Sequence, residues 1–321
     1  MSKTKISILI LISNLIFLAS IFLGPRVINP FELNGTEKEI LLSIRLPMVI
    51  VGGLMGIALG ASGAVLQGIL RNPLADPYIL GISSGAALSA ALGLLSGFHL
   101  LGKFSIPLTA FIGASFVSIL VGRFGWRRGE LRPERLLLAG IGLGFLFYSI
   151  LMLLISVSSD EGMRRALLWI FGDLSIADWS TIPYGFIFIS AGLFLSISRA
   201  KALNALVLGD DLAYSLGFSV HRERLLLFAS VAVMTAASVS LGGTVGFIGL
   251  IIPHIVRFFV GADSRLLIPV SAISGGAFLC IADLIGKSIM PPMEIPSGIV
   301  TAIIGSPYFL YLLRKRDVLS V

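Results

Sequence analysis

Charged residues are scarce in this chain. Asp, Glu, Lys and Arg together form 13 % of its 321 residues, whereas 56 % are hydrophobic. Because a soluble domain usually carries about 25 % charged residues, this composition excludes an ordinary soluble protein. The mean hydropathy of +0.99 indicates a protein that crosses the membrane several times. No stretch is long and polar enough to form a separate soluble domain, so we expect one transmembrane domain over residues 1–321.

Cysteine is nearly absent, and the first apolar run lacks a cleavage site. The one cysteine, Cys280, lies in an apolar segment, which excludes an internal disulfide. Lys3 and Lys5 precede the apolar run Ile6–Pro25, but no small-residue cleavage site follows it. We therefore expect this run to remain as a first membrane helix.

The residues of enzyme and metal sites are also missing. His99, His221 and His254 lie in three separate segments, so we do not expect them to form one metal site. Residues 97–103 match the start of a phosphate-binding loop, but Phe104 stands where that loop needs Ser or Thr. We expect no catalytic residues, no metal and no cofactor, so energy from ATP would have to come from a partner.

Nine uncharged apolar runs mark the membrane spans. They are Ile6–Pro25, Leu46–Leu70, Pro77–Gly102, Phe104–Gly122, Leu136–Ser159, Trp179–Ser198, Leu225–Val256, Leu266–Ala282 and Ile295–Leu313. As one helix the seventh run would extend about 48 Å, far beyond a hydrocarbon core of roughly 30 Å. We therefore divide it by a turn at Gly242-Gly243, with a short second part over about 246–260. The prediction is an all-α bundle of about ten transmembrane helices.

The basic residues favour one orientation of this bundle. An even number of spans places both termini on one side, and both termini are basic. With both ends in the cytoplasm, seventeen of the 24 Lys and Arg residues fall in cytoplasmic segments, as the positive-inside rule requires. On the outer side, Leu167–Asp178 is too short to span and is expected to be a surface or re-entrant helix. Trp169, Trp179 and Tyr184 beside it would suit the membrane interface.

The stretch Arg45–Ala86 is the most distinctive part of the sequence. Gly52, Gly56 and Gly60 recur every four residues within its first apolar run. Glycines one helical turn apart leave a groove that a neighbouring backbone can enter, so we expect this helix to lie inside the bundle.

Longer motifs make the sequence specific. Arg45-Leu46-Pro47 and the spaced glycines lead to Gln67, followed by RNPLADP (residues 71–77) and LGISSGA (residues 80–86). Near the C-terminus, residues 246–257 read GFIGLIIPHIVR. Together these motifs resemble the FecCD family of ABC-importer permeases, and the resemblance covers roughly residues 40–316.

The resemblance implies a function and a set of partners. The family's permeases carry ferric siderophores, haem or cobalamin across the inner membrane of bacteria and archaea. The chain would then be a type II ABC-importer permease in the inner or plasma membrane and one half of a dimer, which we expect to be a homodimer. Its partners would be cytoplasmic ATP-binding cassette ATPase subunits, an extracytoplasmic substrate-binding protein and membrane lipid, with no nucleic acid. The permease itself would not be an enzyme.

The cargo stays open. A ferric siderophore is the expected substrate because it is the commonest cargo of the family, with haem, cobalamin or molybdate as alternatives. An alternative of another class is an ion-coupled secondary transporter. That mechanism would need acidic residues near the middle of the membrane, and the spans offer only Asp283, near a helix end.

The segment 203–222 is the candidate contact for the ATPase. Its apolar residues follow helical spacing and two glycines mark helix ends, so we expect two short amphipathic helices in the cytoplasm. Asp210-Asp211 stands where a helix N-cap would be useful. The family pattern LG-x-x-x-A-x-SLG matches residues 208–217, and the resemblance implies that the segment couples to the ATPase. We expect the coupling residues to be Leu206, Gly209, Asp210, Ala213, Leu216 and Gly217. The alternative is a helix pair that lies on the lipid surface.

Two outer basic residues are candidates for docking the binding protein. In the family such residues receive acidic side chains of that partner, and Arg45 and Lys287 match their positions. Met48 stands where the family has a second arginine, so we expect altered strength or geometry of docking. Since Asp283 and Lys287 are one turn apart, a simple i, i+4 ion pair is the alternative.

Overall fold

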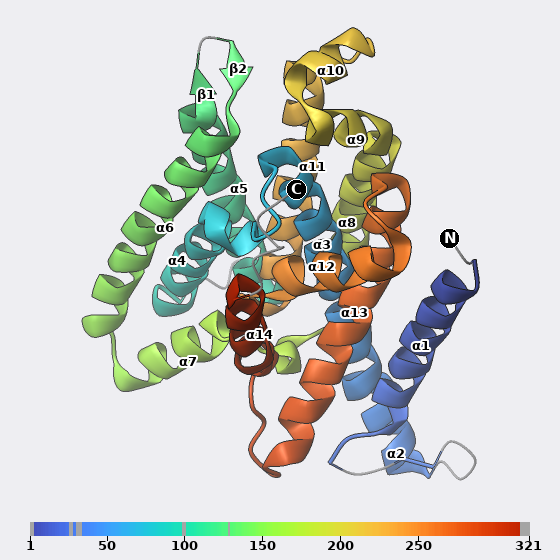
Figure 1. Ribbon diagram of the computed structural model, residues 1–321. Helices are drawn as coiled ribbons and strands as arrows, with labels where there is room; N and C mark the ends of the chain where they lie inside the picture. The colour runs from blue at the N-terminus through green and yellow to red at the C-terminus, as the bar shows by residue number, and fades with distance from the viewer. Residues whose placement is uncertain (1–2, 26–27, 30–33, 98–100, 128, 315–321) are drawn as a thin grey trace.

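The computed structural model describes residues 3–25, 28–29, 34–97, 101–127 and 129–314, and these form a bundle of helices (Figure 1). Outside the described residues lie His99 and four of the basic residues counted for the orientation of the bundle, which are Arg26, Arg128, Lys315 and Arg316.

Ten helices are the main apolar elements. They are α1 (Lys3–Phe22), α3 (Leu46–Leu70), α4 (Ile82–Leu95), α5 (Ser105–Gly125), α6 (Pro133–Ser156), α8 (Ile182–Ser198), α11 (Val220–Gly242), α12 (Ile248–Val260), α13 (Ser264–Ile289) and α14 (Ser297–Arg314). The smaller elements are α2 (Gly35–Ile40), a π-helical turn η1 (Leu41–Arg45), α7 (Asp160–Ile170), α9 (Ala200–Leu208), α10 (Asp210–Ser215), the 3₁₀ turns η2 (Pro77–Leu80), η3 (Gly102–Phe104) and η4 (Leu174–Ile176), and the antiparallel strands β1 (Trp126–Arg127) and β2 (Glu130–Leu131).

The predicted all-α membrane bundle is confirmed. Among the described residues, five helical segments are long and apolar enough to cross a membrane alone, and α8 reaches the length of a span only together with α9, from which it is bent by 55°. The apolar helices α1, α4, α12 and α14 are shorter. The prediction of about ten spans agrees with the structure when these four are included.

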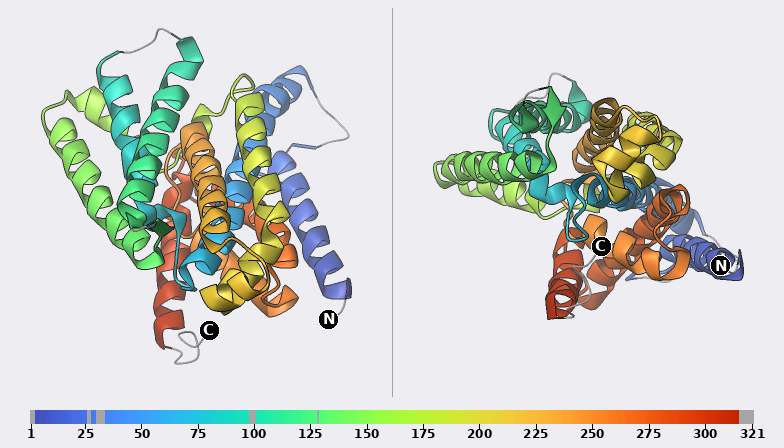
Figure 2. Two further views of the ribbon diagram at one scale, coloured as in Figure 1. Left: turned by 90° about the horizontal axis from the view of Figure 1, so that it is seen from above. Right: turned by 45° about the horizontal axis from the view of Figure 1, so that its top comes forward.

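Helices α9 and α10 share one end of the bundle with the start of α1 and the end of α14. In Figure 2 (left) the start of α1 and the end of α14 lie at the same edge as α9 and α10. We call this edge the α9–α10 end and the edge that carries α2 the α2 end.

Helix α3 lies at the centre of the bundle. It contacts α13, α11 and α12 along its length, and Val51, Met55 and Ala58 are completely buried. A helix that is apolar on all sides is stable only when neighbours surround it. Accordingly α3 covers Leu46–Leu70, the residues of the predicted span.

The break between α11 and α12 lies inside the bundle. A Cβ added at Gly242, the last residue of α11, would lie 2.7 Å from Sδ of Met55, and one added at Gly63 would overlap the carbonyl oxygen of Gly249. Met55 and Gly63 flank the middle of α3, so the turn 243–247 is level with that middle. The predicted break is at the right residues, but it is not a surface turn. Because α12 starts at this depth, 13 residues, about 20 Å, suffice for it.

The segment before α8 differs from the prediction. Helix α7 runs over Asp160–Ile170 and therefore begins before the predicted Leu167. Its N-cap is Ser159, whose side chain accepts from the backbone N–H of Gly162. Of the aromatics expected at the membrane interface, Trp179 is exposed, whereas Trp169 is buried and the Tyr184 hydroxyl lies 2.9 Å from that of Ser240 inside the bundle. The interface prediction is wrong for Trp169.

Candidate functional site

Helices α9 and α10 form the candidate coupling segment. Figure 1 shows α10 projecting from one end of the bundle. Gly209, between the two helices, has φ of +138°, and Gly217, after α10, has φ of +84°. These values are unfavourable for residues with a Cβ, so both glycines let the chain turn where the helices end.

The coupling segment has a buried face and an exposed face. Leu206 is 1 % exposed and Ala213 is 0 % exposed, so neither presents its side chain to a partner. Leu216 is 59 % exposed and Tyr214 is 78 % exposed. The six residues assigned from the sequence therefore divide: Leu206 and Ala213 hold the segment on the bundle, and Leu216 belongs to the surface.

Asp210 is an ion-pair partner and not a helix cap. The N-cap of α10 is Gly209, and no side-chain capping bond is present there. The Asp210 Oδ1 atom accepts hydrogen bonds from Arg71 and, at 2.8 Å, from Nη2 of Arg224. Burial acts to raise the pKa of Asp210, but the bond and charge of Arg224 and the charge of Arg71 outweigh it, so this pKa lies below its ordinary value. The capping prediction is wrong because Asp210 lies in the first turn, within reach of both arginines.

A second polar contact joins α9 to α13. The Asn204 side chain donates to Asp263 Oδ1 at 2.8 Å and accepts from the backbone N–H of Ser264 at 2.8 Å. Hydrogen bonds from Arg265 and Asn204 hold the pKa of Asp263 well below its usual range. Sequence reasoning missed this contact, although Asp263 before an apolar run is a typical N-cap signal.

At the α2 end, Arg45 holds the end of α1. Its Nη1 atom donates to the carbonyl oxygens of Ile21, Phe22 and Leu23, with the shortest distance, 2.8 Å, to Phe22. These carbonyls belong to the last turn of α1 and the residue after it, where intrahelical partners are lacking. The guanidinium therefore joins α1 to the start of α3.

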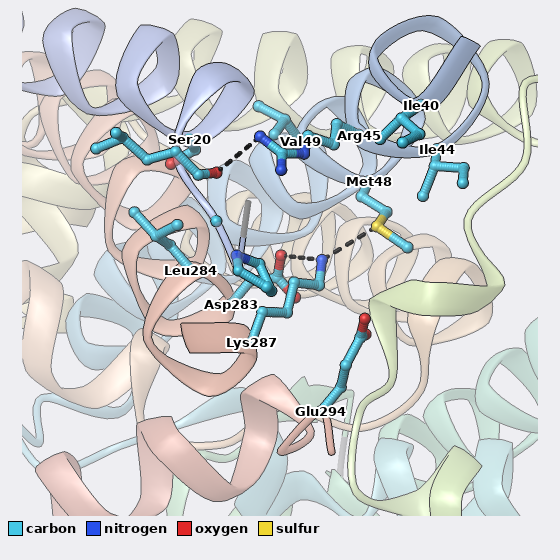
Figure 3. Close-up of a pocket in the computed structure, with 13 residues that line it drawn as sticks. Ser20, Ile40, Ile44, Arg45, Met48, Val49, Asp283, Leu284, Lys287 and Glu294 are labelled. Carbon is cyan, nitrogen blue, oxygen red and sulfur yellow. Dashed lines mark hydrogen bonds and ion pairs between the residues drawn. The ribbon is translucent and has the colours of Figure 1, made fainter. Parts of the chain in front are cut away.

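Lys287 forms the i, i+4 pair that the sequence offered as an alternative. Its Nζ atom lies 2.5 Å from Oδ2 of Asp283, and the two side chains are only 15 % and 14 % exposed. The sulfur of Met48 lies 3.1 Å from the same nitrogen (Figure 3). Met48 thus occupies the space beside this ion pair, at the position where the family has an arginine.

Two hollows share the Asp283–Lys287 pair as a wall. The smaller, about 200 Å³, is lined by Arg45, Met48 and Glu294 among others (Figure 3). The larger, about 600 Å³, also contains Glu294, together with Arg164 of α7 and Asp173. The structure therefore brings Arg45 and Lys287 to one recess at the α2 end, with acidic groups beside them.

The glycines of α3 contact α13 closely. A Cβ at Gly56 would overlap the carbonyl oxygen of Gly275, and one at Gly60 would overlap that of Ser271. At Gly52 the nearest atom would be a side-chain carbon of Leu174, at 3.0 Å. Gly56 and Gly60 therefore admit another backbone, whereas Gly52 makes room for a side chain.

Gln67 is a buried polar residue for which the sequence analysis predicted no role, although it is part of the first motif. It donates to the carbonyl oxygens of Gly249, at 3.1 Å, and Leu250, and accepts from Arg257 Nη2 at 3.1 Å. A glutamine inside an apolar run was the available signal, because buried amides need partners. These bonds connect α3 to both ends of α12.

Comparison with known proteins identifies the family. The model of the FecCD transport family matches residues 6–315, nearly the whole chain. The chain belongs to the FecCD transport family. This permease is 40 % identical to the hemin transport system permease protein of Yersinia pestis, over 88 % of this chain and 86 % of that protein. It is 34 % identical to the iron(3+)-hydroxamate import system permease protein FhuG of Bacillus subtilis, over 94 % of each.

A solved structure has the same architecture. It is described as the inward-facing conformation of a metal-chelate type ABC transporter, and the permease matches it with a TM-score of 0.89 at 28 % identity. The match covers 98 % of this chain and 100 % of that chain. The fold is thus that of an ABC transporter permease along its whole length.

Proposed function

We propose that this permease carries a ferric siderophore across the inner or plasma membrane as the membrane subunit of an ABC importer. The observation that carries the proposal is the set of relatives, whose names include iron(3+)-hydroxamate, hemin and cobalamin permeases over almost the whole chain. A siderophore is the commonest cargo that the sequence motifs imply. Haem, cobalamin and molybdate are the alternatives for the same transporter.

The ATPase would bind at α9 and α10. Exposed Leu208, Tyr214 and Leu216 form an apolar surface on short helices beyond the bundle. An exposed apolar patch on a part of a protein outside the membrane usually marks a contact with another protein. A groove on the ATPase would cover this patch. The assignment places the α9–α10 end, and with it both termini, in the cytoplasm.

The substrate-binding protein would dock at the opposite, α2 end. Arg45 and Lys287 line the recess there, and acidic side chains of the binding protein would meet them. Because Lys287 already pairs with Asp283, the attraction is weaker than the sequence motif alone implies. Met48→Arg would place a second cation beside Asp283, and we expect tighter docking at low salt in this variant.

The permease would work as a homodimer. One face of α6 is apolar and open: Leu138, Phe145 and Leu153 are 69 %, 72 % and 65 % exposed. Lipid and a second copy are the surroundings that suit such a face in a membrane. The substrate path would then lie between the two subunits.

Reconstituted transport tests this function. The permease, its ATPase and its binding protein are placed in vesicles and offered a ferric siderophore, haem, cobalamin and molybdate in turn. We expect uptake of the siderophore that requires ATP and is insensitive to ionophores. Uptake of another cargo would reassign the substrate, whereas uptake that ionophores abolish and ATP does not support would indicate an ion-coupled transporter.

A further inference from the structure

Asp210 lies where α10 meets two other parts of the chain. One carboxylate oxygen, Oδ1, accepts from Arg71 at the end of α3 and from Arg224 in α11. Asp211, the next residue of α10, is exposed and makes no ion pair with any of the described residues. Of two adjacent acids on one short helix, only Asp210 is connected to the membrane helices.

Arg71 connects this carboxylate to the first of two loops. It is the residue after α3 and has φ of +47° and ψ of +38°, which is uncommon for a residue other than glycine. Its Nε atom donates to the Leu206 carbonyl at 2.8 Å, while Nη2 binds Asp210. Residues 72–76 follow directly and lead to η2 and α4. A displacement of α10 therefore acts on the residue at which α3 turns into this loop.

Arg224 connects the same carboxylate to a second loop. Its side chain is only 4 % exposed, and its Nη1 atom donates to the carbonyl oxygen of Leu131 at 3.0 Å. Leu131 belongs to the hairpin β1–β2, which joins α5 to α6. Through one buried guanidinium, Asp210 thus reaches the connection between two further membrane helices.

We propose that Asp210 is the positioning residue that transmits movement of the coupling segment to both connections, the loop 72–76 and strand β2 (Glu130–Leu131). The inference rests on the proposed function, because it requires an ATPase that moves α9 and α10. Charge-assisted hydrogen bonds are short and strong, so both arginines follow the shared oxygen when α10 moves. The loops at the ends of α3 and α5 then move together with α10.

Other contacts hold the coupling segment on the bundle without Asp210. Leu206 and Ala213 are buried, and Asn204 binds Asp263 at the start of α13. An Asp210→Asn variant keeps the side-chain shape and loses the charge. It should therefore leave the segment in place and weaken only its connection to the two arginines.

The test measures substrate transported per ATP hydrolysed in the reconstituted complex. We expect Asp210→Asn to retain the ATPase and hydrolyse ATP but to transport roughly tenfold less substrate per ATP, as for other residues that couple two sites. Asp210→Glu should recover part of the loss because it restores the charge. Asp211→Asn is the matched control and should couple normally. Arg71→Gln should also lower transport per ATP, and combining it with Asp210→Asn should give less than the product of the two losses.

Three results would overturn the proposal. The first is normal transport per ATP in Asp210→Asn, and the second is an equal loss in Asp211→Asn. The third is normal transport per ATP in Arg71→Gln. This variant decides the question if Asp210→Asn does not assemble, because it leaves the Asp210–Arg224 pair in place. A wild-type permease that binds no ATPase and transports without ATP would instead refute the proposed function itself.

Discussion

The two ends of α3 are held by the same chemistry, and its middle is held differently. At the α2 end Arg45 binds the carbonyls that close α1, and at the α9–α10 end Arg71 binds the carbonyl of Leu206 in the last turn of α9. A cation there adds a hydrogen bond to carbonyls of the last helical turn and lies at the negative end of the helix dipole. Between them, Gly56 and Gly60 bring α3 against the backbone of α13.

The contact between the middle of α3 and α13 is therefore fixed, whereas the polar contacts at the two ends of α3 are adjustable. Backbones in contact cannot shift without opening a gap or colliding, because interiors are closely packed. Long side chains can rotate and still keep their hydrogen bonds. We therefore expect substitutions in the middle of α3 to affect folding, and substitutions in the polar contacts at its ends to affect partner binding or transport more than folding.

The largest expected effect is at the fixed contact. Gly56→Ala adds a Cβ only 2.2 Å from the carbonyl oxygen of Gly275, and overpacking against a backbone atom that cannot rotate away should cost about 3 kcal/mol or more. Gly122→Ala in α5 is the control, because the nearest atom to the added Cβ would be a side-chain carbon of Phe228 at 3.4 Å, an ordinary van der Waals contact. Alanine favours a helix over glycine by about 1 kcal/mol, so the control should be neutral or stabilising. Thermal unfolding in detergent measures the stability of both variants. Equal melting temperatures for Gly56→Ala and the control would show that α3 and α13 separate easily.

The next effect divides the two faces of the coupling segment. Leu206→Asp buries a carboxylate among apolar side chains and should strongly lower the yield of folded permease. Leu216→Asp changes an exposed side chain and should leave folding intact while the ATPase no longer co-purifies. The yield of each variant and a pull-down of the ATPase measure this. Ala213→Arg should behave like Leu206→Asp, since Ala213 is fully buried. If Leu216→Asp retains the ATPase and normal transport, the partner does not bind at this face.

The sequence was sufficient for the regular parts of this fold. Long uncharged runs predict spans such as α3 to the residue, because twenty or more apolar residues have few alternatives to a membrane helix. Glycine spacing predicts close packing of α3, and Gly209 and Gly217 predict the ends of two short helices. These signals are local, since each depends on neighbouring residues along one helix.

Contacts between distant residues could not be predicted in this way. Arg71 and Asp210 are 139 positions apart, and Gln67 and Arg257 are 190 positions apart. Nothing in the spacing of either pair indicates that they meet. The depth of the turn 243–247 was missed for the same reason, because only its contacts with α3 determine that depth.

A smaller effect is expected at Lys287, at the α2 end of the bundle. Lys287→Gln leaves Asp283 without its cation in a site where both side chains are mostly buried. We expect a loss of about 1–3 kcal/mol in stability. Adding Asp283→Asn should recover most of it, because the uncompensated charge is then removed. Thermal unfolding of the single and double variants, with binding-protein affinity at low salt, separates the two roles. Weaker docking at unchanged stability would show that Lys287 acts only at the partner surface.

The smallest effect is expected at an exposed ion pair between two loops. Lys103 pairs with Asp178 across two loops of the α2 end, and their side chains are 72 % and 30 % exposed. Hydrogen bonds from Lys103 and Ser180 lower the pKa of Asp178 to about 2. A carboxylate with a lowered pKa stabilises the fold above its unfolded pKa of about 3.9, and the contribution disappears as the pH falls towards 2.

Lys103→Gln should therefore change stability little between pH 6 and pH 8, because water and salt screen an exposed pair. The difference in stability between wild type and variant should be constant from pH 6 to pH 8, shrink below about pH 4 and vanish in 1 M salt. Melting curves of wild type and variant at several pH values and two salt concentrations measure it. A large, salt-insensitive loss would mean that this pair resembles the polar contacts at the α9–α10 end and joins its two loops as firmly as Asp210 joins α10 to α3.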